Sequence, residues 1–220
     1  MTGANILKRI LQFYILILLA VTGGCGMSKE KDNGKANQEP MPETEAFQDE
    51  FTREFMKSAE EIEEGYYTFE SKTKGYTMLF PENGKISKGD YEQVDTDYEA
   101  LSFAEKIDQE NVTYFVTINF EESPHAKNTS LYTKQLSIAT GYSGEYTPYK
   151  LEDKTIYYGE YTDHDSGLYF YNAYIFSNES DKGIRFVFSG RCIDEPKSCE
   201  PSPSVIKDRI KRVTESITFK

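Results

Sequence analysis

Apolar side chains recur at two different periods along this chain. Over residues 43–64 they are three or four positions apart, which predicts one amphipathic helix that ends at Gly65. From residue 66 onward the period becomes two, which predicts β-strands separated by short polar turns. The apolar positions of the predicted helix are Phe47, Phe51, Phe55, Ala59 and Ile62. The predicted strands are 66–70, 76–81, 99–107, 112–120, 154–162, 168–177 and 184–190.

Two more helices are predicted, at 129–140 and 204–215. Leu131, Gln135 and Ile138 line one side of the first, which ends at Gly141. Short turns require antiparallel strands, and the 168–177 strand is apolar on both faces, so it needs cover on both sides. We therefore expect an α+β fold, in which helices pack on both faces of an antiparallel sheet of about seven strands.

The N-terminus has the pattern of an export signal. Lys8 and Arg9 precede an apolar run over residues 10–21 that is too short to span about 30 Å of hydrocarbon. The segment that follows, Val-Thr-Gly-Gly-Cys, resembles the lipobox of bacterial prolipoproteins. That resemblance implies removal of residues 1–24 and a diacylglyceryl group on Cys25, which would anchor the chain to the outer face of the cell membrane. Acyl chains contribute about 0.8 kcal/mol per buried CH₂, so two chains anchor stably.

Residues 25–44 have the composition of a disordered tether, rich in Lys, Glu, Asn, Gly and Pro. Residues 45–220 then form one domain, without a second linker or an internal repeat.

The charge balance narrows the choice of partners. Loss of Lys8 and Arg9 with the signal changes the net charge from −12 to −14. Nucleic-acid binding needs clustered lysine and arginine, so we expect no nucleic-acid partner. The same balance argues against a domain that lies flat on an anionic membrane.

The two remaining cysteines, Cys192 and Cys199, lie in a loop-like segment. Outside the cytoplasm such a pair predicts a disulfide, which would stabilise the fold by about 2–2.5 kcal/mol. Their spacing differs from the C-x-x-C of redox sites, and no further zinc ligand lies close by in the sequence.

The sequence offers no strong catalytic, metal or cofactor motif. His125 and His164 are the only histidines, and the aspartates beside His164 lack the pattern of a calcium loop. Carboxylates are plentiful, so an acid–base pair of a hydrolase stays open as an alternative.

Aromatic usage suggests a recognition surface. The chain has 17 tyrosines and no tryptophan, and tyrosine supplies rigid amphipathic contact area for protein or carbohydrate recognition. We take Tyr142, Tyr146 and Tyr149 as candidates for such a surface. The alternative is that these rings fill core layers beneath the helices.

The order of elements resembles the PsbP-like fold. Residues 70–81 are similar to the opening hairpin of such domains, and residues 212–219 are similar to their final helix and tail. The chain also resembles, in general style, the poorly characterised surface lipoproteins of Gram-positive bacilli.

We therefore expect a non-enzymatic surface lipoprotein that binds or scaffolds an envelope protein or a matrix component. The main alternative is a hydrolase that acts on cell-wall or extracellular polymer through acidic residues. A third interpretation is a solute-binding component of a transporter, but such proteins are usually larger and have two lobes.

Overall fold

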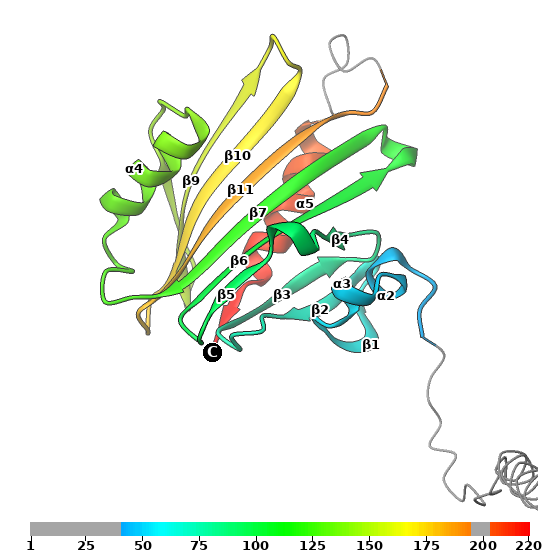
Figure 1. Ribbon diagram of the computed structural model, residues 1–220. Helices are drawn as coiled ribbons and strands as arrows, with labels where there is room; N and C mark the ends of the chain where they lie inside the picture. The colour runs from blue at the N-terminus through cyan, green and yellow to red at the C-terminus, as the bar shows by residue number, and fades with distance from the viewer. Residues whose placement is uncertain (1–40, 195–202) are drawn as a thin grey trace, which may run out of the picture. The chain divides into compact units, whose positions relative to one another are not determined.

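The computed structural model describes residues 41–194 and 203–220. The chain divides into two units, residues 1–38 and 39–220, and all the described residues belong to the second. Four helices and twelve strands make up this described part (Figure 1). The helices are α2 (Glu45–Gln48), α3 (Glu50–Arg53), α4 (Thr129–Thr140) and α5 (Pro203–Ser216), with short 3₁₀ turns η1 (Lys88–Asp90) and η2 (Asp108–Glu110). The first strands are β1 (Met56–Glu63), β2 (Tyr66–Glu70), β3 (Tyr76–Pro81), β4 (Lys85–Ile86), β5 (Glu92–Val94) and β6 (Tyr98–Ile107). The later ones are β7 (Val112–Glu122), β8 (Thr147–Lys150), β9 (Lys154–Asp163), β10 (Leu168–Ser177), β11 (Lys182–Cys192) and β12 (Thr218–Phe219).

The strands form two antiparallel sheets instead of the single sheet of about seven strands that the sequence predicted. One sheet has four strands in the order β1-β2-β3-β12. The other has eight, in the order β4-β6-β7-β11-β10-β9-β8, with β5 also paired to β6. The sheets separate because β12 occupies the free edge of β3, with Thr218 opposite Thr77. The hairpin β2–β3 therefore has no edge left for β6. The α+β class and the antiparallel pairing are confirmed, whereas the sheet size is corrected, and the PsbP-like resemblance stays a prediction.

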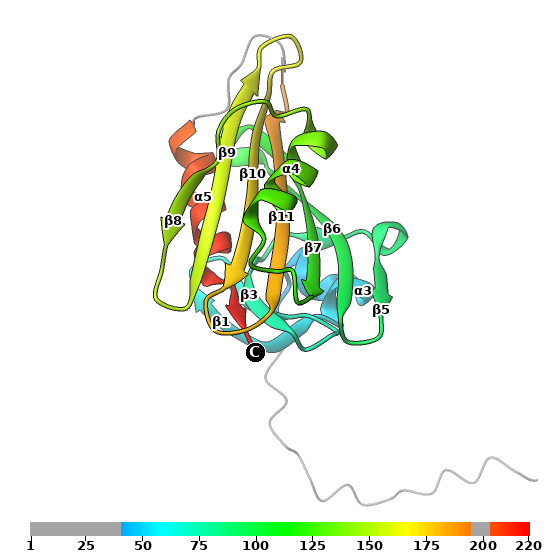
Figure 2. The same cartoon turned by 90° about the vertical axis from the view of Figure 1, so that its left-hand side faces the viewer.

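The main core lies on the inner face of the eight-stranded sheet. Alternate residues of β7 from Val112 to Phe120 are buried there against the four-stranded sheet and α5. Helix α5, which corresponds to the helix predicted over 204–215, adds an apolar stripe in which Ile206, Ile210 and Val213 are almost fully buried. Helix α4 packs on the opposite, outer face (Figure 2). The prediction of helices on both faces is thus confirmed for the larger sheet.

Helix α4 has the predicted bounds. The side chain of Asn128 accepts a hydrogen bond from the backbone N–H of Leu131 at 3.2 Å, which caps the first turn. The buried side of the helix, however, consists of Tyr132 and Leu136. The predicted stripe is solvent-facing instead, since Leu131 and Ile138 are exposed.

The helix predicted over residues 43–64 is wrong beyond its first turns. Asp49 ends α2 and caps α3, and from Met56 onward the chain pairs with β2 as an edge strand. Gly65 has a φ of +76°, which suits the turn between β1 and β2. A helix C-terminus uses the same left-handed conformation of glycine, so this residue fits both structures.

Candidate functional site

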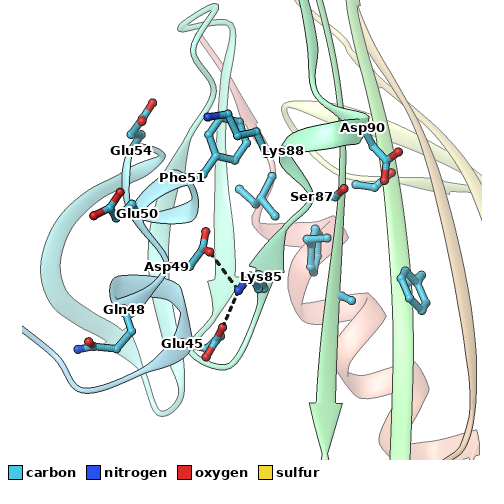
Figure 3. Close-up of a pocket in the computed structure, with 15 residues that line it drawn as sticks. Glu45, Gln48, Asp49, Glu50, Phe51, Glu54, Lys85, Ser87, Lys88 and Asp90 are labelled. Carbon is cyan, nitrogen blue, oxygen red and sulfur yellow. Dashed lines mark hydrogen bonds and ion pairs between the residues drawn. The ribbon is translucent and has the colours of Figure 1, made fainter.

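A wide cleft opens between the two N-terminal helices and the larger sheet. It has a volume of about 820 Å³, and we call it the α3–β7 cleft (Figure 3). Helices α2 and α3 supply one wall, and the β4–η1 segment supplies another. The floor comes from β4, β6 and β7. The apolar residues of the floor are Ile86, Phe103, Ala104 and Phe115, and Phe51 of α3 adds an apolar side chain to the wall.

Lys85 ties two walls of the cleft together. Its Nζ lies 3.2 Å from Oε1 of Glu45 and 3.1 Å from Oδ2 of Asp49 (Figure 3). Hydrogen bonds to these two carboxylates raise the pKa of Lys85. Exposed pairs of this kind contribute only about 0–1 kcal/mol each. The pairs therefore fix the position of α2 beside β4 more than they stabilise the fold.

A capping motif holds α3 against β4. Oδ1 of Asp49 accepts hydrogen bonds from both the backbone N–H and the hydroxyl of Thr52, each at 2.8 Å. The backbone N–H of Ile86 donates to the same hydroxyl at 2.9 Å. Burial raises the pKa of Asp49, but the hydrogen bonds from Thr52 and Lys85 outweigh it and leave that pKa below its usual range. Asp49 is thus held ionised as part of the wall.

An aromatic cage encloses the ammonium of Lys72 behind this wall. The ammonium nitrogen lies 4.9, 4.6 and 5.3 Å from the ring centroids of Phe51, Phe55 and Tyr91. It also pairs with Glu54 on the rim of the cleft. Cation–π contacts at such distances are attractive. The cage therefore fastens α3, which carries Phe51, to the turn between β2 and β3.

A buried glutamate supports the cage from the sheet side. Oε1 of Glu99 accepts a hydrogen bond from the backbone N–H of Lys72 at 2.8 Å and another from the hydroxyl of Tyr91 at 3.1 Å. Glu99 is fully buried, and this burial raises its pKa. Glu99 positions the cage and lies outside the lining of the cleft.

Phe115 is the most exposed part of the apolar floor. It points outward from β7, opposite Ala104 of β6, and 58% of its surface is accessible to solvent. Its neighbours in the strand, Tyr114 and Val116, point inward and are buried. The small side chain of Ala104 leaves the ring of Phe115 open on the cleft side. An exposed aromatic ring inside a hollow is a typical anchor point for a partner.

The rim of the cleft carries a negative balance. The lining includes five carboxylates and only two ammonium groups. Lys85 is already paired with two of the acids. The cleft therefore favours a cationic partner with apolar side chains, by charge and by shape. The acids are Glu45, Asp49, Glu50, Glu54 and Asp90, and the bases are Lys85 and Lys88.

A second, more polar hollow of about 440 Å³ lies near the C-terminal end of β6, beside α5. There the hydroxyl of Tyr114 donates a hydrogen bond to the buried Glu105. Arg209 of α5 lies 3.5 Å from the carboxylates of both Glu105 and Glu110. Burial raises the pKa of Glu105, although Tyr114 and Arg209 oppose the rise.

The three tyrosines predicted as one recognition surface lie on two different faces. The rings of Tyr142 and Tyr146 pack edge to face on the outer side of the sheet, with centroids 5.1 Å apart. Tyr142 also stacks on Tyr161 at 5.8 Å. Tyr149 is 40% exposed and lines a separate cleft beside α5. The structure thus brings together two of the three residues, and a recognition role for any of them stays a prediction.

The predicted lipidation and disulfide sites lie largely outside the described residues. Cys25 and Cys199 fall outside them, and Cys192 is buried at the end of β11. The disulfide therefore stays a prediction. Within residues 41–194 and 203–220, no helix is long and apolar enough to cross a membrane. The same residues contain no cluster of three or more His, Cys, Asp or Glu side chains that could hold a metal ion.

Sequence reasoning missed the α3–β7 cleft, although one signal pointed to it. In the alternating strand 112–120, Phe115 is an aromatic residue at a position where an outward-facing polar residue is expected. The acidic rim gave no signal, because four of its five acids come from residues 45–54, far along the chain from the residues of β6 and β7 in the lining.

Comparison with known proteins places the chain in a family. A family model described as "Putative lipoprotein YvcA" matches residues 42–218. A protein of Bacillus subtilis (strain 168) named "Putative lipoprotein YvcA" is 31% identical to the chain over 242 aligned positions, which cover 97% of both proteins. The match spans the described domain and, with the relative, nearly the whole length. The chain therefore belongs to the YvcA family of lipoproteins.

Proposed function

We propose that this chain is a lipoprotein anchored through Cys25 on the outer face of the cell membrane, and that its domain binds a basic, amphipathic segment of another envelope protein in the α3–β7 cleft. The lipobox-like segment before Cys25 and the family name support the anchor. The cleft supports the binding role, because it combines an apolar floor with an acidic rim.

The exposed ring of Phe115 carries this proposal. Burial of a phenylalanine side chain contributes about 1.5–3 kcal/mol, and most of this ring is still in contact with solvent. An apolar side chain of the partner would cover it, while lysine or arginine side chains next to that anchor would reach Glu50 and Asp90. Charge complementarity of this kind speeds association and makes binding sensitive to salt.

A binding assay with a designed peptide tests the proposal. The full lipidated chain in detergent is titrated with a helical peptide of leucine and lysine, and with the same peptide carrying glutamate in place of lysine. The lysine peptide should bind, and its affinity should fall at high salt. Phe115→Ser should weaken binding about tenfold or more, the equivalent of about 1.4 kcal/mol. The matched control is Ile138→Ser on α4, where the side chain is 74% exposed outside the cleft.

Charge reversal separates specific docking from general attraction to an acidic protein. Glu50→Lys changes the rim of the cleft, whereas Glu152→Lys makes the same change at an exposed loop position outside the lining. The proposal requires a clearly larger loss of affinity for Glu50→Lys. Equal losses for the two variants would show non-specific attraction and would overturn it.

The hydrolase alternative has one observation in its favour. Glu105 is a buried carboxyl group with a raised pKa, and Arg209 contacts both its carboxylate and that of Glu110. A raised pKa suits a general acid. The direct contacts of Glu105 with Tyr114 and Arg209 also suit a purely structural role. Release of soluble fragments from purified cell wall by the full chain, abolished by Glu105→Gln, would favour the hydrolase.

A further inference from the structure

Another cleft, separate from the polar hollow near Glu105, lies on the inner face of the larger sheet between its β8 edge and helix α5. Its volume is about 300 Å³, at the lower end of the roughly 300–1,000 Å³ of small-ligand sites. Strand β8 is short and, within the part of the chain that the structure describes, pairs with β9 alone. This pairing places Tyr149 opposite Ile156. Strand β8 thus lies at one edge of the sheet (Figure 2), and the side chain of Tyr149 lines the cleft there.

Three tyrosines give this cleft flat, partly exposed ring surfaces. Tyr158 and Tyr171 stack nearly parallel, with centroids 5.6 Å apart and planes inclined by 13°. Both rings are half-buried, and Tyr149 is 40% exposed. Among the described residues, the aliphatic side chains in the lining are Ile156 and Ile210. Aromatic ring faces with few aliphatic neighbours are better suited to stack on the C–H groups of a sugar than to bury the apolar side chains of a peptide.

The charges in this cleft cancel. Lys207 lies 2.7 Å from Glu160, and Lys211 lies 3.9 Å from Glu215 one turn further along α5. Burial would raise the pKa of Glu160, but the hydrogen bonds from Lys207 and Tyr169 outweigh it and lower that pKa. Glu160 is therefore ionised at neutral pH. The two ion pairs offer donors and acceptors whose formal charges cancel, although the whole chain is strongly acidic.

We infer that the Tyr149–Tyr158–Tyr171 cleft binds a neutral oligosaccharide, with room for about one or two sugar rings. The ring of Tyr149 stacks on the sugar face. Glu160, Lys207 and Lys211 exchange hydrogen bonds with its hydroxyl groups. A neutral cleft on an acidic protein discriminates against both cationic and anionic ligands, because neither finds a complementary charge there. This inference is independent of the α3–β7 cleft, which faces outward from the same sheet.

The test titrates the full lipidated chain, in a detergent without a sugar headgroup, with chitotriose and with maltotriose, and follows saturation transfer by NMR. At least one trisaccharide should bind saturably. Tyr149→Ala should weaken that binding tenfold or more, and Lys211→Ala, at an exposed position of α5, should weaken it several-fold. The control is Phe115→Ser, which should leave sugar binding unchanged even though it disrupts the other cleft.

Three results would overturn the inference. The first is the absence of saturable binding of either sugar. The second is binding that Tyr149→Ala and Lys211→Ala both leave unchanged. The third is displacement of the sugar from the wild-type protein by a neutral peptide that binds with higher affinity than the sugar. Because the control variant concerns the α3–β7 cleft alone, failure here leaves the proposed protein-binding role standing, and the reverse also holds.

Discussion

Replacement of Lys72 by methionine should destabilise the domain by removing the charge at the centre of the aromatic cage. Methionine keeps an unbranched apolar stem, so the packing of the stem against the rings is largely retained. What disappears is the attraction between one ammonium group and the rings of Phe51, Phe55 and Tyr91, together with its ion pair to Glu54. The variant thus isolates the electrostatic part of the cage.

The expected loss follows from how well the ammonium is shielded from water. A cation–π contact contributes about 0.5–1 kcal/mol at exposed sites and about 2 kcal/mol when desolvated. The side chain of Lys72 is 27% exposed, between these limits, and its single charge is shared among the rings. We therefore expect a loss of about 1–2 kcal/mol. For a domain of this size that corresponds to a decrease in Tm of roughly 3–6 °C.

Thermal and urea unfolding of Lys72→Met and of a control variant, Lys74→Met, measures this loss of stability. Lys74→Met is the matched control, since Lys74 lies in the same turn, its side chain is 70% exposed, and it pairs with Glu70 on the surface. That change should cost less than about 0.5 kcal/mol. Equal losses for Lys72→Met and Lys74→Met would refute the reasoning, because they would show that the cage adds nothing beyond an ordinary surface charge.

Two further predictions concern packing and pH. Gly159→Ala should destabilise the domain by about 1–3 kcal/mol, since the added Cβ would come within 2.3 Å of the ring of Tyr142. The control in the same unfolding assay is Gly89→Ala, whose added Cβ would meet nothing closer than 4.0 Å. Lys220 and Lys74 lower the pKa of Glu70 to about 2. A lowered acid pKa stabilises the fold above the unfolded value of 4.5, and that stability is lost as pH falls from 4.5 to 2. Carboxyl NMR should find this pKa higher after Lys220→Ala, and an unchanged value would contradict the assignment.

Much of the larger sheet could be predicted because its core strands are regular. The alternation from Val112 to Phe120 is uninterrupted on the buried face, and the cover on both faces of the 168–177 strand followed from its apolar residues. The separate smaller sheet could not be predicted. It depends on β12, a two-residue strand at the C-terminus, which is too short to leave a pattern in the sequence.

The failed helix shows where local patterns are ambiguous. Phe47, Phe51 and Phe55 have helical spacing, and all three pack on the main core, but the chain that carries them bends at Asp49. The residues of β1 after Met56 are all exposed, so burial favours neither the helical nor the strand arrangement of this segment. Pairing with β2 decides the structure there, and pairing is a tertiary effect.

The candidate site was predictable only in fragments. Tyr149 was singled out for its residue type and does line a cleft. Tyr142 and Tyr146 instead precede β8 and lie on the opposite face, where Tyr142 packs against Tyr146 and Tyr161. The α3–β7 cleft joins residues from 45 to 115, and only the folded chain brings them together.

Photo-crosslinking from position 115 in living cells tests the central claim most directly. The full chain carries benzoylphenylalanine in place of Phe115, with position 138 on α4 as the exposed control and Cys25→Ala as the control for anchoring. The account predicts one envelope protein, attached through a segment rich in lysine or arginine, from position 115 only and only in the anchored chain. The same products from positions 115 and 138, or no protein product from position 115 in anchored protein, would contradict it.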